Sequence, residues 1–361
     1  MPVIIIASRL RENGLMNHQS HTDALDADLR AAVRAIALPF ESKHGGGVQQ
    51  SSIEPVVSQL PLASLSRWER SIRDELSAAR QALALQRVQG WRAWFMPTRA
   101  VRSPRSLHWV DLCNGDGHIR ERALQALDEP VPNAFVFALA ARRLNDWVPQ
   151  VRAAAQEAVL RVAPLSDPEQ VSTALCVVLA AWSSWGRVET SDRQVILEVL
   201  SMARVANALK DRFITASSGP MASVLSQTLR TSALDADLLT IARQAVQPAV
   251  RARAFRVLLD GEASWVVGRR WEWTDVRYCH GRFTHVMAGR RVAAPAPARS
   301  ALLVQASEDR SPIVRRVAAE ALVRALDDLA EDALPLVRRL AADPARVVAE
   351  RGAFVLKQLN G

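Results

Sequence analysis

The sequence predicts an all-α fold, an α-solenoid of stacked helix pairs, with one small β-hairpin inserted between two repeats. Three observations predict it: a motif that recurs at a nearly constant period, apolar residues at helical spacing within each copy, and one Arg- and aromatic-rich stretch that interrupts the period. We expect residues 1–64 to be a flexible N-terminal region with one helix and a Gly/Ser-rich linker. Residues 65–361 are expected to form the solenoid, and residues 265–292 the hairpin within it.

The motif is clearest in two windows, residues 145–162 and 308–325. Aligned without gaps, they share Asp146/Asp309, Pro149/Pro312, Val151/Val314, Arg152/Arg315, Ala155/Ala318 and Ala158/Ala321. Shorter copies occupy 114–127 and 247–259, and a weaker one begins at Asp343. Six matches in so short a window indicate internal repeats.

The position of the motif Arg gives the period. It falls at 120, 152, 251 and 315, with Ala349 in the last copy, so the intervals are 32, 99, 64 and 34 residues. The interval of 99 fits three units, and the interval of 64 fits one unit plus roughly 30 residues. The segment from Trp265 to Val292 has that length, which predicts that it is an insertion.

Each copy has the pattern of a turn followed by an amphipathic helix. Asp can cap a helix start, Pro is tolerated in the first turn, and Val-x-x-x-Ala-x-x-Ala lies on one helix face. Further helix starts are expected at Asn133, at Asp167, at a capping box of Ser191 with Gln194 before one apolar helix at 195–209, and at another of Ser66 with Glu69 before a helix whose apolar face carries Ile72, Leu76, Ala79 and Leu83. The last of these helices is predicted to shield the first repeat.

These features resemble HEAT repeats, particularly the short variety of phycobilisome-lyase-like proteins. The resemblance covers residues 114–163 and 245–361, while 164–244 is helical and divergent. The period is shorter than the ~40 to 47 residues of long HEAT units. The resemblance implies that four motif residues form a polar ladder between repeats and have structural roles. They are Asp146, Arg152, Asp309 and Arg315.

Composition restricts the class of protein. The formal net charge is +9, and only three of the 46 basic residues are lysines. The Arg- and Ala-rich composition is typical of a GC-rich bacterial genome, so the charge has two interpretations, codon bias or an acidic partner. No apolar run is long enough to span a membrane, and the three cysteines form no Cys-x-x-Cys pair, which favours a cytoplasmic protein with free thiols.

The hairpin insertion is the first candidate site. It carries six arginines against Glu272 and Asp275, interleaved with aromatic residues. Arg and aromatic side chains suit a protein interface or contacts with phosphates and bases. The alternative is that the aromatics only attach the hairpin to the adjacent helices. The predicted binding residues are Arg269, Arg270, Trp271, Trp273, Arg277, Tyr278 and Arg282.

A second candidate patch lies in a Pro-containing loop at residues 90–109. It contains Arg99, Arg102 and Arg105 among four aromatic residues. Long loops of this kind are often functional, although its aromatics are also suited to closing the end of the core.

Neither catalysis nor a cofactor is predicted. The chain has no nucleophile elbow, Walker loop, Gly-rich dinucleotide turn or His-Glu-x-x-His helix. The segment 111–117 resembles a calcium loop but has Leu112 and Ala123 where acidic ligands are required, so no metal site is expected.

The predicted function is that of a non-enzymatic scaffold or adaptor. It would bind an acidic protein partner through its concave face and the Arg-aromatic insertion. One alternative is a solenoid that binds nucleic acid, including a DNA-repair enzyme similar to HEAT-like DNA glycosylases, with Trp109 and Asp111 or Trp147 and Asp146 as the pair to consider. Another is a neutraliser or assembly factor in a bacterial conflict system. The sequence leaves the oligomeric state open.

Overall fold

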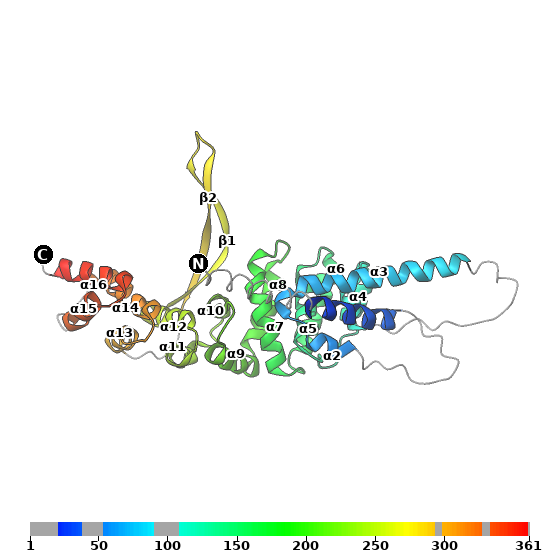
Figure 1. The fold of residues 1–361 in the computed structure, drawn as a ribbon, viewed down its shortest axis with the longest axis horizontal. Coiled ribbons are helices and arrows are strands. Elements are labelled where there is room, and N and C mark those ends of the chain that lie inside the picture. Colours follow the sequence, from blue (N-terminus) through cyan, green and yellow to red (C-terminus); the bar gives the residue numbers. More distant parts are fainter. Residues whose placement is uncertain (1–20, 38–52, 90–107, 293–297, 327–332, 360–361) are drawn as a thin grey trace, which may run out of the picture. The chain divides into compact units, whose positions relative to one another are not determined.

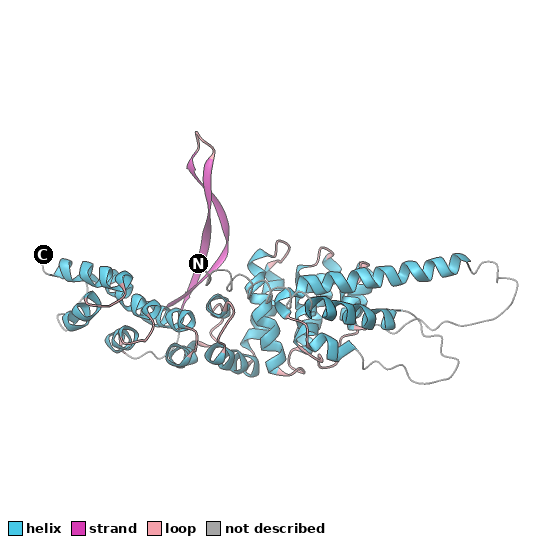
Figure 2. Cartoon of the chain, in the orientation of Figure 1, coloured by secondary structure: helices cyan, strands magenta, loops and turns pink. Residues whose placement is uncertain are grey.

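The computed structural model describes residues 21–37, 53–89, 108–292, 298–326 and 333–359 (Figure 1). This part of the chain is mostly helical and contains a two-stranded antiparallel hairpin (Figure 2). The expected combination of helices with a hairpin is therefore confirmed. The chain divides into two compact units, residues 1–177 with 186–195 and residues 178–185 with 196–361.

The first unit begins with a helix at 21–37 and continues through short and long helices. They are α2 (Ile53–Ser58), η2 (Leu62–Ser64), α3 (Leu65–Gln89), η4 (Trp109–Cys113), α4 (Gly117–Gln125), α5 (Ala134–Arg142), η5 (Arg143–Asn145) and α6 (Pro149–Val162). The helices α7 (Pro168–Ala181) and α8 (Thr190–Ser201) each belong partly to both units, and η6 (Trp182–Ser184) belongs to the second.

The second unit contains the remaining helices and both strands. They are α9 (Ala203–Thr215), α10 (Met221–Thr228), η7 (Asp235–Asp237), α11 (Leu238–Gln244), α12 (Pro248–Asp260), β1 (Glu262–Asp275), β2 (His280–Arg291), α13 (Arg299–Ser307), α14 (Pro312–Arg324), α15 (Leu334–Ala341) and α16 (Arg346–Leu359). Six helices, α7 to α12, occupy the interval in which the period predicts three two-helix units.

The N-terminal region contains more structure than the sequence predicted. One helix was expected in residues 1–64, whereas the described part of this region has helices at 21–37 and at α2. Leu29, Val33, Ile53 and Val57 are buried there, so both helices contribute to the core of the first unit. The predicted Gly/Ser-rich linker lies outside the described residues.

The repeat motif lies on helices, as expected: α4, α6, α12, α14 and α16. Pro occupies the first turn of α6, α12 and α14, where its missing N–H needs no partner. The Val and Ala positions are fully buried, as in Val314, Ala318 and Ala321 of α14. In the second unit α11, α13 and α15 each pack on the motif helix that follows them, and α12, α14 and α16 pack on one another in order.

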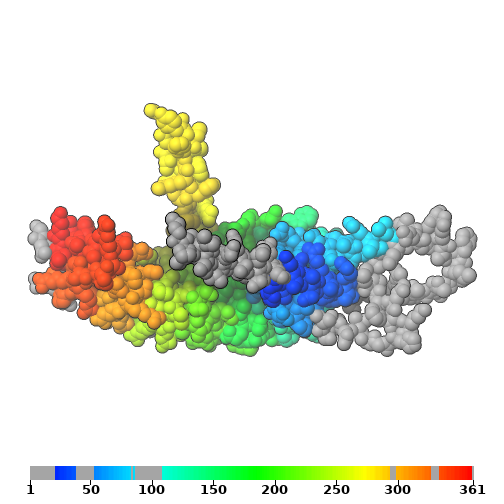
Figure 3. Space-filling view, in the orientation of Figure 1, coloured from blue at the N-terminus to red at the C-terminus, as the bar shows by residue number. Residues whose placement is uncertain are grey.

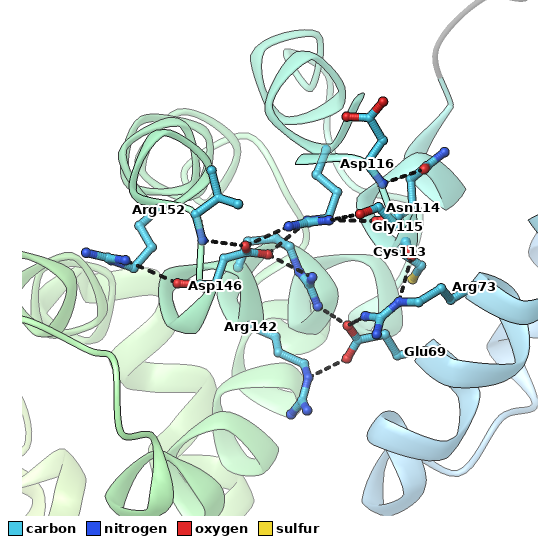
Figure 4. A network of polar contacts seen from close by, with 12 residues as sticks. Glu69, Arg73, Cys113, Asn114, Gly115, Asp116, Arg142, Asp146 and Arg152 are labelled. Atoms are coloured by element: carbon cyan, nitrogen blue, oxygen red, sulfur yellow. Dashed lines mark hydrogen bonds and ion pairs between the residues drawn. The ribbon is translucent and has the colours of Figure 1, made fainter. Parts of the chain in front are cut away.

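The expected polar ladder joins consecutive motif helices of the first unit. Arg120 of α4 donates two hydrogen bonds to Asp146, at 2.9 and 2.8 Å, and two more to the carbonyls of Asn114 and Gly115 (Figure 4). Asp146 also accepts from the backbone N–H of Val148, which fixes the turn before α6. One buried ion pair thus connects two helices and the turns that precede them.

The same geometry recurs in the second unit. Arg251 pairs with Asp309, and Arg315 pairs with Asp343, in each case through Nε and Nη2 of the guanidinium at 2.6 to 2.9 Å. Arg251 and Asp309 are 58 residues apart because the hairpin lies between them, whereas Arg315 and Asp343 are 28 apart. The hairpin is therefore inserted between two motif helices of the second unit, α12 and α14, that pack directly on each other.

The ladder differs at Arg152, which donates to the Asp146 carbonyl and has two acidic partners at the start of α8, Glu189 just before it and Asp192 in its first turn. Its Nη2 donates to Glu189 at 2.6 Å, and its Nε lies 3.7 Å from Asp192. Asp192 is buried in the first turn of α8 and accepts from the Glu189 N–H. The predicted capping box of Ser191 with Gln194 is therefore wrong, because α8 begins at Thr190 and Asp192 is the capping side chain.

Two helix boundaries also differ from the prediction. The apolar run from Val195 to Leu209 was expected to be one helix, but Met202 has extended backbone and separates α8 from α9. The capping box of Ser66 with Glu69 is absent because α3 begins at Leu65. Its predicted buried face is present, with Ile72, Leu76 and Ala79 in the core.

Glu69 instead holds α3 to the repeats through arginine residues. It pairs with Arg73, Arg142 and Arg143, and Arg143 also contacts Asp146 (Figure 4). Burial opposes ionisation of Glu69, but these guanidiniums outweigh it and lower its pKa. Nearby, burial raises the pKa of the Cys113 thiol to about 12, so this cysteine is an inert part of the core.

Among the helices that the structure describes, none combines the length and the apolar character needed to span a bilayer.

Candidate functional site

The hairpin forms because its two strands alternate in character and are joined by a tight turn. β1 and β2 pair antiparallel from Glu262↔Arg291 to Asp275↔His280. The turn is Val276–Cys279, closed by the Asp275 carboxylate, which accepts the N–H groups of Arg277 and Tyr278. The sequence placed Cys279, His280 and Gly281 in the turn, whereas His280 and Gly281 belong to β2.

The base of the hairpin is attached to the helices of the second unit by Arg290. Its guanidinium donates to the Asp235 carboxylate at 2.6 and 2.8 Å and to the Leu229 carbonyl at 2.8 Å, and it also donates to the Thr231 carbonyl. Asp235 is buried. A single side chain therefore links β2 to η7 and to the segment between α10 and η7.

Arg230 supplies a second attachment, on β1. Its guanidinium lies 4.5 Å from the Trp182 ring centroid and 5.5 Å from that of Trp265, a cation–π arrangement with two rings. It also donates to the Val266 carbonyl at 3.0 Å. At the base of the hairpin, an aromatic residue, Trp265, thus helps to attach the hairpin to the helices.

The distal half of the hairpin is different, because its large side chains are exposed. Trp271, Trp273, Tyr278 and Phe283 are 41%, 55%, 73% and 65% exposed. Figures 1 and 3 show the two strands extending away from the helices of their unit. These four aromatics are therefore not used to seal the core of the unit.

The aromatic residues gather on one face of the ribbon. The strand period of two and the pairing Trp271↔Phe283 place Trp271, Trp273 and Phe283 on this face, together with Arg269. The ring centroids of Trp271 lie 5.5 Å from Trp273 and 4.9 Å from Phe283, both edge to face. We call these three rings the aromatic cluster.

The opposite face carries charge. Arg270, Glu272 and Arg282 alternate with the aromatic positions, and the Arg282–Glu272 pair is long, at 4.0 Å, and exposed. Arg269, Arg270, Arg277 and Arg282 outnumber Glu272 and Asp275, so the distal hairpin carries an excess of positive charge. The structure brings all seven predicted hairpin residues onto one ribbon, with Arg277 and Tyr278 at its tip.

The three arginines of the second predicted patch cannot be placed. Arg99, Arg102 and Arg105 lie outside the described residues. The neighbouring Trp109 is buried against Phe135, at a centroid distance of 6.2 Å, so it belongs to the core.

The carboxylates considered for a repair enzyme have structural partners. Asp146 is paired with Arg120 and Arg143, and Asp111 caps η4 by accepting from the His108 N–H. Trp147 is 68% exposed, but its neighbour Asp146 is buried in the ladder. Within the described ranges, no three His, Cys, Asp or Glu side chains are grouped to hold a metal ion.

Sequence reasoning missed the residues that position the hairpin. Arg230 is 35 positions from Trp265 and 36 from Val266, and Asp235 is 55 from Arg290, while Trp182 contacts the hairpin's partner Arg230. All three belong to the divergent region. A local pattern cannot reveal such contacts, because each depends on how distant helices pack.

No known protein family model matches this chain, and no curated protein matches it in sequence.

Proposed function

We propose that this protein is a non-enzymatic α-solenoid of HEAT-like repeats that binds an acidic protein partner, with the distal hairpin as its principal contact. The observation that carries the proposal is the contrast along the hairpin: a base fixed by Arg290 and Arg230, and a distal half with an exposed aromatic cluster flanked by arginines. The recurrent Arg–Asp ladder supports the repeat architecture.

Physical chemistry favours a binding role for this arrangement. Exposed rings lose the free energy that burial would give, about 25 cal/mol per Å² of apolar surface. Trp, Tyr and Arg are the residues that dominate protein interfaces, and a fixed base limits the entropy lost on binding. A preorganised arm with three packed rings therefore suits insertion into a partner's surface.

The cysteine at the hairpin tip allows a direct test. Cys279 is exposed, Cys113 is buried, and a Cys176→Ser background leaves Cys279 as the reactive thiol. A photo-crosslinker attached there should capture a protein from nuclease-treated native lysate. The captured protein would be identified by mass spectrometry, purified, and titrated against the full chain.

Hairpin variants give the quantitative part of the test. Trp271→Ala should weaken binding of the purified partner about thirtyfold, the loss of roughly 2 kcal/mol typical of a hot spot. Joint reversal of Arg270 and Arg277 to Glu should also weaken it, without lowering Tm. Arg193→Glu, an exposed charge reversal on α8, is the matched control.

Two results would count against the proposal. A large fall in Tm on substituting Trp271, with unchanged partner affinity, would give the cluster a packing role. Loss of all capture after nuclease treatment, with salt-dependent binding to duplex DNA or RNA, would favour the nucleic-acid alternative, because phosphate binding weakens steeply with salt.

A further inference from the structure

A group of arginines outside the hairpin surrounds a single carboxylate in the second unit. Glu320 of α14 lies 2.6 Å from Nη2 of Arg256 on α12, 3.3 Å from Nε of Arg316 on α14, and 3.4 Å from Nε of Arg351 on α16. The side chains of these three arginines are 35% to 41% exposed. Three consecutive motif helices thus contribute guanidiniums to one place on the surface.

The charges at this place do not balance. Arg253 lies next to Arg256 on α12, and Arg324 pairs with Asp260 at 2.7 Å. Burial and then the neighbouring Arg256 charge lower the pKa of Arg253, whose guanidinium donates to a carbonyl rather than a carboxylate. Five guanidiniums therefore share two carboxylates. We call Arg253, Arg256, Arg316, Arg324 and Arg351 the arginine cluster.

The arginine cluster and the hairpin belong to one continuous surface. Arg253 donates to the backbone carbonyl of Ser264 in β1, at the base of the hairpin. Figure 1 shows α12, α14 and α16 on the side of the second unit from which the hairpin rises. A molecule that contacts the hairpin therefore meets this face of the motif helices next.

Apolar side chains on the same helix stripes indicate what kind of molecule fits. Ile313 precedes Arg316 by three residues, and Val347 and Phe354 flank Arg351 at helical spacing; all three are 45% to 48% exposed. Exposed apolar side chains beside guanidiniums suit a polypeptide that carries both apolar and acidic groups. An evenly charged phosphate backbone offers no apolar groups for these side chains to contact.

We propose that the arginine cluster on α12, α14 and α16 binds the carboxylates of an acidic peptide segment of the partner that the hairpin holds. This inference rests on the proposed function. Glu320 then acts as an internal counter-ion, which keeps the guanidiniums in place and is displaced by a carboxylate of the partner.

The test uses defined polyanions and the full chain. A fluorescein-labelled poly-L-glutamate of about twenty residues and a labelled oligo-dT of equal length are titrated by fluorescence anisotropy at several salt concentrations. The wild-type protein should bind poly-L-glutamate more tightly than oligo-dT. The double substitution Arg316→Gln with Arg351→Gln should weaken poly-L-glutamate binding roughly tenfold. Arg338→Gln, an exposed position on α15, should leave it unchanged.

A second variant gives an effect of opposite sign. Glu320→Gln removes the competing carboxylate and should strengthen poly-L-glutamate binding severalfold, although the arginines then repel one another and Tm falls. A merely structural role for Glu320 predicts weaker binding in this variant. The gain therefore separates anion binding from folding.

Some outcomes overturn the inference. These are tighter binding of oligo-dT than of poly-L-glutamate, absence of binding to either probe, or full binding by the Arg316 and Arg351 double variant. If any of them occurs while crosslinking at Cys279 still depends on Trp271, the proposed function stands and the cluster assignment fails. If crosslinking fails but poly-L-glutamate binding depends on the cluster, the assignment stands and the role of the hairpin fails.

Discussion

At the scale of single residues, the hairpin has a non-glycine residue where the backbone favours glycine, and a glycine where the backbone does not require one. Cys279 has φ 53°, a left-handed conformation that usually selects Gly, whereas Gly281 lies in the regular strand β2. The reason for Gly281 is steric. A Cβ there would lie 2.5 Å from the indole ring of Trp271, so the glycine provides the space in which this ring lies.

Substitution of Gly281 by Ala should therefore disrupt the aromatic cluster without unfolding the unit. The new methyl group displaces Trp271 from its edge-to-face contact with Trp273, so the exciton signal of this pair in circular dichroism should diminish. Partner affinity should fall with it. Gly268→Ala is the matched control, because its Cβ would meet no atom within 4 Å. Equal spectra for both variants would contradict the steric explanation.

At the scale of secondary-structure elements, the ladder makes the motif helices interdependent. Arg251 is 3% exposed in its side chain and Asp309 is 12% exposed, so the pair is almost excluded from water. Removal of one partner leaves the other as an uncompensated buried charge. The contact also joins α12 to the turn before α14, the two segments of the second unit between which the hairpin is inserted.

Arg251→Ala should therefore destabilise the second unit by about 3 kcal/mol. The matched control is Arg346→Ala on α16, because Arg346 forms an exposed i,i+4 pair with Glu350 at 2.6 Å. Its loss should leave the unfolding free energy nearly unchanged, because an exposed ion pair gains little in water. Urea denaturation of the full chain measures both changes. Similar losses for the two variants would show that the ladder contributes no more than a surface ion pair.

The elements that could be predicted from the sequence are those with a repeated local pattern. The motif helices, the insertion and the hairpin follow from spacing, because each copy repeats the same turn and the same buried face. The break at Met202 and the start of α3 were missed, since tertiary packing decides both. In the candidate site, the exposed Arg and aromatic residues of the hairpin were found through composition, but Arg230, Asp235 and Glu320 act through partners on other elements and leave no local pattern.

At the scale of the whole molecule, both units depend on carboxylates that are ionised in the folded state. Asp146 and Glu69 serve the first unit, and Asp309 and Asp343 the second. In Asp309, burial opposes ionisation, but hydrogen bonds from Arg251 and the Ser311 N–H lower its pKa. In Asp343, the hydrogen bond from Arg315 is the main cause of its lowered pKa. Both units should therefore lose stability when acid protonates these carboxylates.

The sign of the pH dependence follows from these depressed pKa values. The pKa of Asp in an unfolded chain is about 3.9. The folded chain therefore keeps these carboxylates ionised at pH values where the unfolded chain begins to bind protons. Unfolding free energy should therefore be steady above about pH 5 and decrease progressively toward about pH 2. Urea midpoints measured across this range test the expectation.

Protonation also raises the net positive charge of the whole chain, so the contribution of the ladder has to be separated from general repulsion. A variant with Asp309→Asn and Asp343→Asn is less stable at neutral pH, but it lacks two of the groups that titrate. Its unfolding free energy should therefore decrease less steeply with acid than that of the wild type. An identical slope would assign the acid sensitivity to net charge, and a loss of stability on raising the pH through this range would contradict the depressed pKa values themselves.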